Sequence, residues 1–240
     1  MLATRLRAPL ALVAFVCAIA VPTAWADDSA EFCLPVPYRS QADGTVWAAS
    51  NCGPTAIAMV LEAYGFDIPT LKLRQRANQL LGISNPSTGT RIQDLARIVG
   101  EYGLSVTGPY EGNRFRRWTL DEVQQEVHDG KPVVAQVYFP LLPNHRENPV
   151  ATDHYIVIVG TYDGGFIFND PSDRDQPGYR QKMTADEFTR AWGRSQYPFA
   201  GFSVGPGKDG HSLEQPPPSP EANDAGAAQA ERARTAPPPQ

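Results

Sequence analysis

The sequence has 240 residues, of which 42% are hydrophobic and 20% are charged, and its formal net charge is −5. This length supplies apolar material for one domain-sized core but not for a large multidomain protein. The acidic balance excludes a basic face that follows nucleic-acid phosphates, so no nucleic-acid partner is expected. Three cysteines are too few for a disulfide scaffold.

The first 26 residues have the pattern of a secretory signal peptide. Two arginines lie near the start, residues 9–21 form an apolar run, and residues 24–26 read Ala-Trp-Ala, a small-x-small cleavage pattern. The alternative, an N-terminal membrane anchor, requires a longer apolar run. We therefore expect a secreted protein, periplasmic or extracellular, without a membrane span after cleavage.

Helical periodicity dominates the first half of the chain that follows. Apolar residues at helical spacing predict three helices, over residues 54–64, 71–81 and 92–102. In the second of these, Arg74 and Arg76 are expected to be solvated rather than to form an anion site. A capping box that begins at Thr119 predicts a fourth helix, which ends near residues 128–130.

The second half changes to strand patterns. Strands are expected over residues 132–139, 154–159 and 166–170, with a Gly/Asp turn between the last two. A second capping box, at Thr184, predicts a last helix that turns Phe188, Ala191 and Trp192 toward the core. Helices followed by an antiparallel sheet predict an α+β fold of two lobes with a cleft between them.

The end of the chain, residues 205–240, is expected to be a disordered tail rich in proline and alanine. The last 35 residues contain eight prolines, no aromatic residue and one large aliphatic residue, Leu213. Such a segment cannot bury enough surface to offset its ordering entropy. The folded domain is therefore expected over residues 32–204, and we expect it to be monomeric.

Cys52 is the candidate nucleophile. If the helix begins at Pro54, Cys52 lies just before its first turn, where free amide N–H groups and the helix dipole stabilise a thiolate. Gly53 is expected to leave room for a substrate to approach the sulfur. The alternative is a structural cysteine, either bonded to Cys33 or buried as a small apolar residue. Cys52 lies outside the apolar stripe of its helix, which favours the reactive role.

A thiolate nucleophile requires a general base, and usually a residue that orients the base. His154 stands at the head of a strongly apolar strand and is the best candidate. His128 is expected to be solvated, and His211 lies in the tail. His145 lies in a Pro-rich loop, and nothing beside it in the sequence suggests a role. No metal or cofactor is expected, since HExxH and CxxC motifs and paired histidines at ligand spacing are lacking.

Asp170 is the candidate orienting residue, and its relation to His154 depends on the turn of the predicted hairpin. A five-residue loop, 160–164, would set His154 directly opposite Asp170 on one face of the sheet. A two-residue turn, 163–164, would place the two side chains on opposite faces, and both loop lengths are common. Asp170 is also well suited to a strand-ending turn before Pro171.

Catalysis at a carbonyl also needs donors for the oxyanion. The backbone N–H of Cys52 can supply one, and Gln41 is the neutral amide closest upstream, although it also reads as an ordinary loop residue. Trp47 could line a substrate pocket, and a core role is equally compatible with the sequence.

These segments occur in one order: VPYRSQ (36–41), NCGPTAIAMVLEAYG (51–65), GTRIQDLARIVGEYGL (89–104), DGKPVVAQVYF (129–139), DHYIVIVGTYDGGFIFNDPSD (153–173) and MTADEFTRAW (183–192). The succession resembles the papain-like cysteine peptidases of the double-glycine, bacteriocin-processing type, specifically their stand-alone family thirty-nine-like relatives. The resemblance covers residues 34–192, and the pairing of NCGPTA with the later DHYIVIVG and NDP is its most specific part.

The resemblance implies four site residues: Cys52 as nucleophile, His154 as base and acid, Asp170 as orienting residue and Gln41 as side-chain oxyanion donor. It also implies a papain-like division, with the Cys helix in one lobe and the His strand in the other. The leader-processing relatives carry this domain on a membrane transporter, and no transporter segment is recognised in this sequence, so the substrate stays open. We expect an exported thiol hydrolase that acts on a peptide or protein. The alternatives are an acyl transferase or cell-wall amidase with the same triad, and an inactive binding module.

Overall fold

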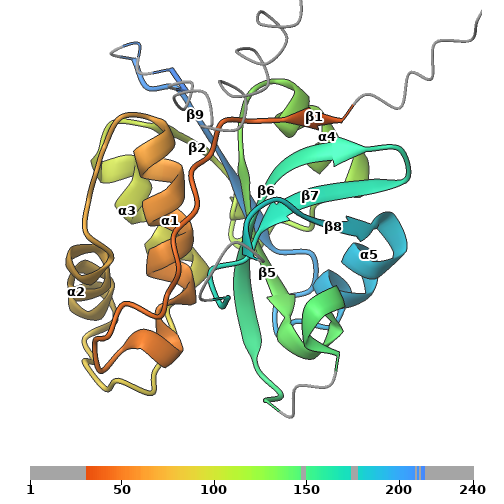
Figure 1. Ribbon diagram of the computed structural model, residues 1–240. Helices are drawn as coiled ribbons and strands as arrows, with labels where there is room; N and C mark the ends of the chain where they lie inside the picture. The colour runs from red at the N-terminus through yellow and green to blue at the C-terminus, as the bar shows by residue number, and fades with distance from the viewer. Residues whose placement is uncertain (1–30, 147–149, 174–177, 209, 211, 214–240) are drawn as a thin grey trace, which may run out of the picture.

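The computed structural model describes residues 31–146, 150–173, 178–208, 210 and 212–213. The signal peptide expected over residues 1–26 and most of the tail expected over 205–240 lie outside the described residues. In the part that is described, none of the helices is both long and apolar enough to cross a membrane. The described chain forms a helical lobe beside a sheet lobe (Figure 1).

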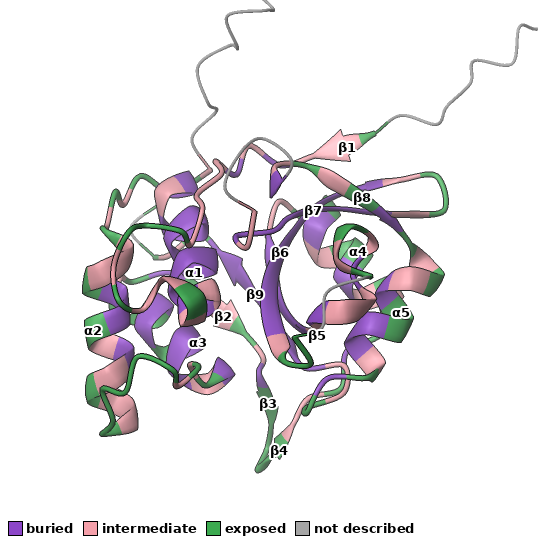
Figure 2. Ribbon diagram, turned by 60° about the horizontal axis from the view of Figure 1, so that its bottom comes forward, coloured by how far each residue is buried: buried purple, intermediate pink, exposed green. Residues whose placement is uncertain are grey.

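The helical lobe consists of α1 (Cys52–Ala63), α2 (Thr70–Leu81) and α3 (Ile92–Glu101). Helix α1 packs against both of its neighbours and against strand β6 of the sheet lobe. It is therefore buried on almost every side, as Figure 2 shows, and its sequence is apolar all round rather than in one stripe. Helix α1 therefore packs between the two lobes, and α3 also contacts the sheet lobe, at β2 and β9.

The expectation that both arginines of α2 are solvated is wrong for one of them. Arg76 lies at the surface and pairs with Glu101. Arg74 is fully buried, and its guanidinium donates to the carbonyl oxygens of Ser50 at 3.1 Å and Thr88 at 2.6 Å. It holds together the two loops that flank the start of α1. Sequence periodicity could not show this, because both loops are remote from Arg74 along the chain.

The sheet lobe is built on one antiparallel sheet, whose strand order is β2-β9-β5-β6-β7-β8, with β1 beside β6. The strands are β1 (Phe32–Cys33), β2 (Ser105–Thr107), β5 (Val133–Tyr138), β6 (Asp153–Tyr162), β7 (Gly165–Asn169), β8 (Gln181–Thr184) and β9 (Gly201–Gly205). A separate hairpin joins β3 (Tyr110–Glu111) to β4 (Arg114–Phe115). The predicted α+β fold class, a helical lobe beside an antiparallel sheet lobe, is confirmed.

Two helices, α4 (Leu120–His128) and α5 (Ala185–Gly193), cover the sheet, and both begin where the capping boxes place them. The side chains of Thr119 and Thr184 each accept a hydrogen bond from the backbone N–H three residues on. In return, the backbone N–H of each threonine donates to the side chain of the glutamate at that position. Among the described residues there are also three short 3-10 helices: η1 (Ala48–Ser50), η2 (Phe139–Leu141) and η3 (Pro143–His145).

Strand β9 was not expected from the sequence, although it lies inside the sheet between β2 and β5. All five of its residues are buried, and they begin and end with glycine. Short, glycine-bounded segments of this kind read as loops, and only the pairing with β5 and β2 makes this one a strand.

The hairpin of β6 and β7 combines features of the two registers considered from the sequence. Its turn is the two-residue one, since Tyr162 pairs with Gly165. That register, continued, would put His154 and Asp170 on opposite faces. A β-bulge between Ile158 and Gly160 inserts one residue and shifts the ladder by one, so that Val157 pairs with Asn169. Because side-chain direction has a period of two, the shift returns His154 and Asp170 to one face.

The bulge makes the two residues diagonal neighbours rather than directly opposed. The five-residue loop was therefore the wrong turn, although the shared face it implied is present. Diagonal neighbours on one face lie within reach of long or aromatic side chains. The carbonyl oxygen of Val159, the inserted residue, accepts from the N–H of Leu34 at 2.7 Å, so the segment after β1 occupies the bulge.

Candidate active site

Cys52 is the first residue of α1, two residues earlier than the helix start predicted at Pro54. Burial raises the pKa of the Cys52 thiol, but the hydrogen bond and charge of His154 and the backbone N–H groups of Tyr155 and Gly53 outweigh it, so the pKa is lowered. The first N–H groups of a helix have no partner within the helix and point toward a group at its N-terminus. This environment favours a thiolate at Cys52.

His154 lies near the start of β6, between the cysteine and the carboxylate. Its Nε2 is 2.7 Å from Oδ1 of Asp170, and its side chain also interacts with the Cys52 thiol, whose pKa it lowers. Since Nε2 is hydrogen-bonded to Asp170, Nδ1 is the ring nitrogen available to the Cys52 thiol. The imidazole is therefore held between a nucleophile and a carboxylate, in the arrangement of a catalytic triad.

Asp170 follows β7 directly and is wholly buried. The N–H and Oγ of Ser172 donate to its Oδ1 at 2.8 and 2.7 Å. The residue is therefore both the turn residue before Pro171 and the carboxylate that faces His154. The two interpretations left open by the sequence are compatible because the turn fixes the carboxylate's direction.

The charges of the site stabilise one another. Burial lowers the pKa of His154, but the charge and hydrogen bond of Asp170, with those of Cys52, outweigh it and raise the pKa to about 10. Burial raises the pKa of the Asp170 carboxyl, yet the charge of His154 and hydrogen bonds from His145, His154 and Ser172 hold it below its usual range. These shifts favour a state in which Cys52 is a thiolate, His154 an imidazolium and Asp170 a carboxylate.

His145 is the site residue that sequence reasoning missed. Its Nε2 is 3.0 Å from Oδ2 of Asp170, the oxygen that does not face His154. The Pro-rich loop around His145 carries no local pattern that indicates this contact. His128, in contrast, is exposed as expected, where it stacks on Phe32 and meets the hydroxyl of Thr161.

Gln41 lies in a loop that is fastened to the segment after β7. Its backbone N–H donates to the carbonyl oxygen of Pro171 at 2.7 Å, and its Nε2 donates to the carbonyl oxygen of Ala48 at 3.0 Å. One of the two Nε2 hydrogens therefore stays available for another acceptor. The hydroxyl of Tyr38 holds the same loop by donating to the carbonyl oxygen of Asp170 at 3.1 Å.

Gly53 has a role in helix packing that was not expected from the sequence. A Cβ at this position would lie 2.2 Å from Oγ1 of Thr90 and 2.7 Å from Cδ1 of Leu95. Glycine is therefore required so that α1 can pack closely on its neighbours, and Gly53 is not among the residues that line the cavity beside Cys52. Trp47 lies outside the cavity at Cys52 and lines a separate surface hollow with α2.

The two cysteines of the described chain are both free. Cys33 pairs with Gly160 on β6, whereas Cys52 contacts Tyr155 on the same strand. Five strand residues separate these positions by roughly 16 Å, while a disulfide needs Cα atoms within about 7 Å. A Cys33–Cys52 bridge, the redox switch considered from the sequence, is not formed here.

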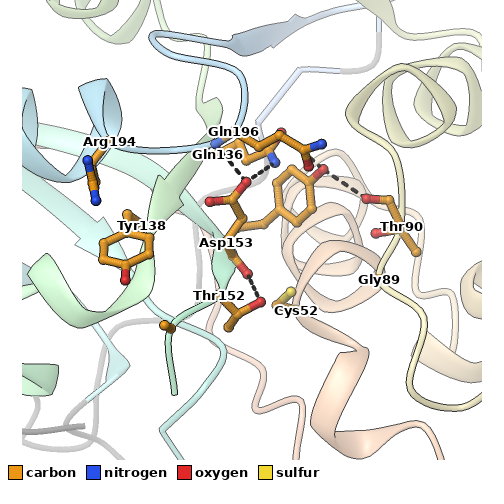
Figure 3. Close-up of a pocket in the computed structure, with 11 residues that line it drawn as sticks. Cys52, Gly89, Thr90, Gln136, Tyr138, Thr152, Asp153, Arg194 and Gln196 are labelled. Carbon is orange, nitrogen blue, oxygen red and sulfur yellow. Dashed lines mark hydrogen bonds between the residues drawn. The ribbon is translucent and has the colours of Figure 1, made fainter. Parts of the chain in front are cut away.

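A cavity of about 510 Å³ opens beside Cys52. Gly89 and Thr90 line one side, Tyr138 and Arg194 line the other, and Asp153 lies between them in the view of Figure 3. Most of these groups are polar, and the carboxylate of Asp153 is held by Nε2 of Gln136 and the N–H of Gln196. The cavity spans the cleft between the lobes, and the sulfur has access to it.

One set of described residues has the spacing of a metal site. Ligand atoms of His145, Asp170 and Asp173 all lie within 4.8 Å of one another. These atoms already have protein partners, since Asp170 bonds both histidines and Asp173 accepts from Nε2 of Gln181 at 2.7 Å. The set therefore fits a hydrogen-bonded cluster better than a vacant ion site.

Comparisons with known proteins show which family and which solved structures this chain resembles. Residues 33–198 match the model of the Peptidase_C39 like family. A C39-like peptidase from Bacillus anthracis aligns with a TM-score of 0.53 at 19% identity, over 73% of this chain and 97% of its own. A double glycine motif protease from an AMS/PCAT transporter, solved with its leader peptide, aligns at 0.47 and 21%, over 72% and 91%. A search of curated proteins found no match.

A helical lobe that presents a cysteine to a histidine on an antiparallel sheet defines a papain-like cysteine peptidase fold. The chain belongs to the Peptidase_C39 like family, since the family model covers more than half of it. The resemblance stated from the sequence is thereby confirmed, and the chain is a cysteine peptidase-like hydrolase.

Proposed function

We propose that this protein is an exported thiol hydrolase that cleaves a peptide or related amide bond through a Cys52 thioester. His154 acts as base and acid, and Asp170 orients it. The observation that carries the proposal is the unbroken chain of contacts from sulfur to imidazole to buried carboxylate, at a helix N-terminus that opens on a cavity.

In the first half of the reaction the Cys52 thiolate attacks the carbonyl carbon of the scissile bond. The imidazolium of His154 then gives its Nδ1 proton to the leaving nitrogen as the C–N bond breaks. The amine leaves, and the acyl group stays on sulfur as a thioester. Because Nε2 remains bonded to Asp170, the ring does not turn away during the transfer.

The oxyanion of each tetrahedral intermediate needs donors that are present before the reaction. The backbone N–H of Cys52 is one, because it lies in the first turn of α1. The second Nε2 hydrogen of Gln41 is the other. Water then attacks the thioester, His154 takes its proton, and the C–S bond breaks to release the acid.

Export is supported by the charge, apolar run and cleavage pattern of residues 1–26. Expression of the full chain, followed by N-terminal sequencing of the protein recovered outside the cytoplasm, tests it. The proposal expects a mature start at Asp27. A protein retained in the cytoplasm with its first 26 residues intact would overturn it.

The site is tested by the pH dependence of Cys52 alkylation in the reduced protein, read by peptide mass spectrometry. Cys33 is the internal control, since burial raises the pKa of its thiol. Rapid labelling of Cys52 near pH 6, slowed in His154→Ala, is expected of a thiolate–imidazolium pair. Labelling only at high pH and indifferent to His154 would favour an inactive binding module.

A further inference from the structure

Asp170 stands between two imidazoles, although the proposed mechanism uses only one of them. Oδ1 faces Nε2 of His154 at 2.7 Å, and Oδ2 faces Nε2 of His145 at 3.0 Å. Among the described residues, His145 is the one that donates a hydrogen bond to Oδ2 of Asp170. A carboxylate that is wholly buried needs such donors on both oxygens if it is to stay ionised.

His145 is held in place for this contact. Its ring stacks on Phe139 with centroids 4.2 Å apart, and Phe139 also contacts the ring of His154 at 5.0 Å. The N–H of His145 donates to the carbonyl oxygen of Leu142 at 3.0 Å, which fixes the turn of η3. The side chain is 11% exposed. One aromatic ring therefore aligns both histidines that meet Asp170.

The hydrogen bonds around Asp170 also define which atom of His145 carries a proton. Oγ of Ser172 donates to Oδ1 of Asp170 at 2.7 Å and lies 3.1 Å from Nε2 of His145. Because the ionised carboxylate can only accept, Nε2 of His145 must be the donor to Oδ2. The contact holds whether His145 is neutral or protonated.

We propose that His145 is a positioning residue of the active site, which acts through Asp170 to keep the carboxylate ionised and aimed at His154. The proposal rests on the proposed function, since it concerns the same triad. It extends the chain of contacts to four side chains: Cys52, His154, Asp170 and His145. Within the described chain, the hydrogen bonds and the ring contact of His145 are with Asp170, Ser172, Leu142 and Phe139, none of which lines the cavity.

The alternative is that His145 only packs its loop against Phe139. A double-mutant cycle separates the two roles, because a residue that acts through Asp170 has no further effect once Asp170 is gone. His145→Phe keeps the stacked ring and removes the donor. His145→Gln replaces Nε2 with an amide N–H at a similar reach. His128→Phe is the matched control, since His128 is an exposed histidine on α4.

The readout is the rate of Cys52 alkylation at pH 6, together with kcat and KM for a cleaved peptide. We expect His145→Phe to slow alkylation and lower kcat on the order of tenfold, the size of one hydrogen bond to a charged group, with KM unchanged. His145→Gln should recover most of the loss, and His128→Phe should match the parent. In Asp170→Ala, the added His145→Phe change should have no effect.

Equal losses from His145→Phe with and without Asp170 would overturn the proposal, as would a His145→Phe protein with the parent's alkylation profile. Thermal melts of each variant identify those that fail to fold. If His145→Phe unfolds, the comparison of His145→Gln with the parent decides, because the proposal requires its pH profile to stay near that of the parent. A site in which Cys52 is indifferent to His154→Ala would instead contradict the proposed function itself.

Discussion

The start of α1 and the end of the β6–β7 hairpin bring the reacting groups together in opposite ways. Cys52 is placed by local structure, since a helix that begins at this residue supplies the surrounding N–H groups. Asp170 is placed by non-local structure, through a two-residue turn, a bulge at Val159 and donors from distant loops. A nucleophile can be set by a few neighbouring residues, whereas the orientation of its base depends on the register of a whole hairpin.

The largest effect is expected on the helical side. Cys52→Ser should lower hydrolysis by at least about 10⁴-fold, because the hydroxyl is far less acidic than the thiol and the site is built for a thiolate. The measurement is the turnover of a cleaved peptide. Cys33→Ser serves as the control and should keep the parent's rate, since Cys33 is on β1 and remote from the site. Equal losses in both variants would contradict the assignment.

The next largest effect is expected at the hairpin. Asp170→Asn should lower kcat by at least roughly 10²-fold, because the imidazolium of His154 loses its counter-charge. Without the Asp170 charge the pKa of His154 should fall, and a neutral His154 stabilises the Cys52 thiolate less. Alkylation of Cys52 should therefore require a higher pH. Asp163→Asn, the same change in the exposed turn of this hairpin, should have little effect on kcat. A parent-like rate in Asp170→Asn would mean that the carboxylate has a structural role only.

Gly53 tests how tightly the helical side is packed. Gly53→Ala should lower the free energy of unfolding by about 1–3 kcal/mol, since its Cβ would overlap the side chains of Thr90 and Leu95. Gly100→Ala is the control, because Gly100 lies on the exposed side of α3 with open space around it. It should be neutral or stabilise by up to about 1 kcal/mol. Chemical denaturation of both variants measures the difference, and equal stabilities would show that α1 can move.

The last prediction needs no mutation and concerns how hydrolysis by the parent protein depends on pH. The pKa of Cys52 is lowered, so the thiolate forms at a lower pH than that of an ordinary cysteine. The pKa of His154 is raised to about 10, so the imidazolium persists up to that pH and is lost above it. Hydrolysis should therefore be nearly constant between these limits and fall on both sides. The stability that the raised pKa of His154 contributes should be complete below the histidine's usual pKa of 6.5 and be lost as the pH rises through about 10. A profile that falls near pH 6.5 would indicate an unperturbed histidine.

Local patterns account for most of the helices predicted from the sequence. The capping boxes at Thr119 and Thr184 place the starts of α4 and α5 to the residue, because the cap's hydrogen bonds are between near neighbours. Strand β9 was missed, and Arg74 was placed in solvent, because each depends on partners far along the chain. The extra residue at Val159 was equally invisible, since a bulge has no fixed sequence signature.

The sequence by itself determined that Cys52 lies at the start of a helix, within two residues, that apolar strands follow with His154 and Asp170 at their ends, and which family the chain resembles. These features rest on short-range hydrogen bonds and on the spacing of apolar residues. Only the tertiary structure decided that His154 and Asp170 share a face, that Gly53 serves close packing, and that His145 meets the second oxygen of Asp170. The physical reason is that each of these depends on a backbone register or a loop contact, in which one residue's displacement reverses or removes the interaction.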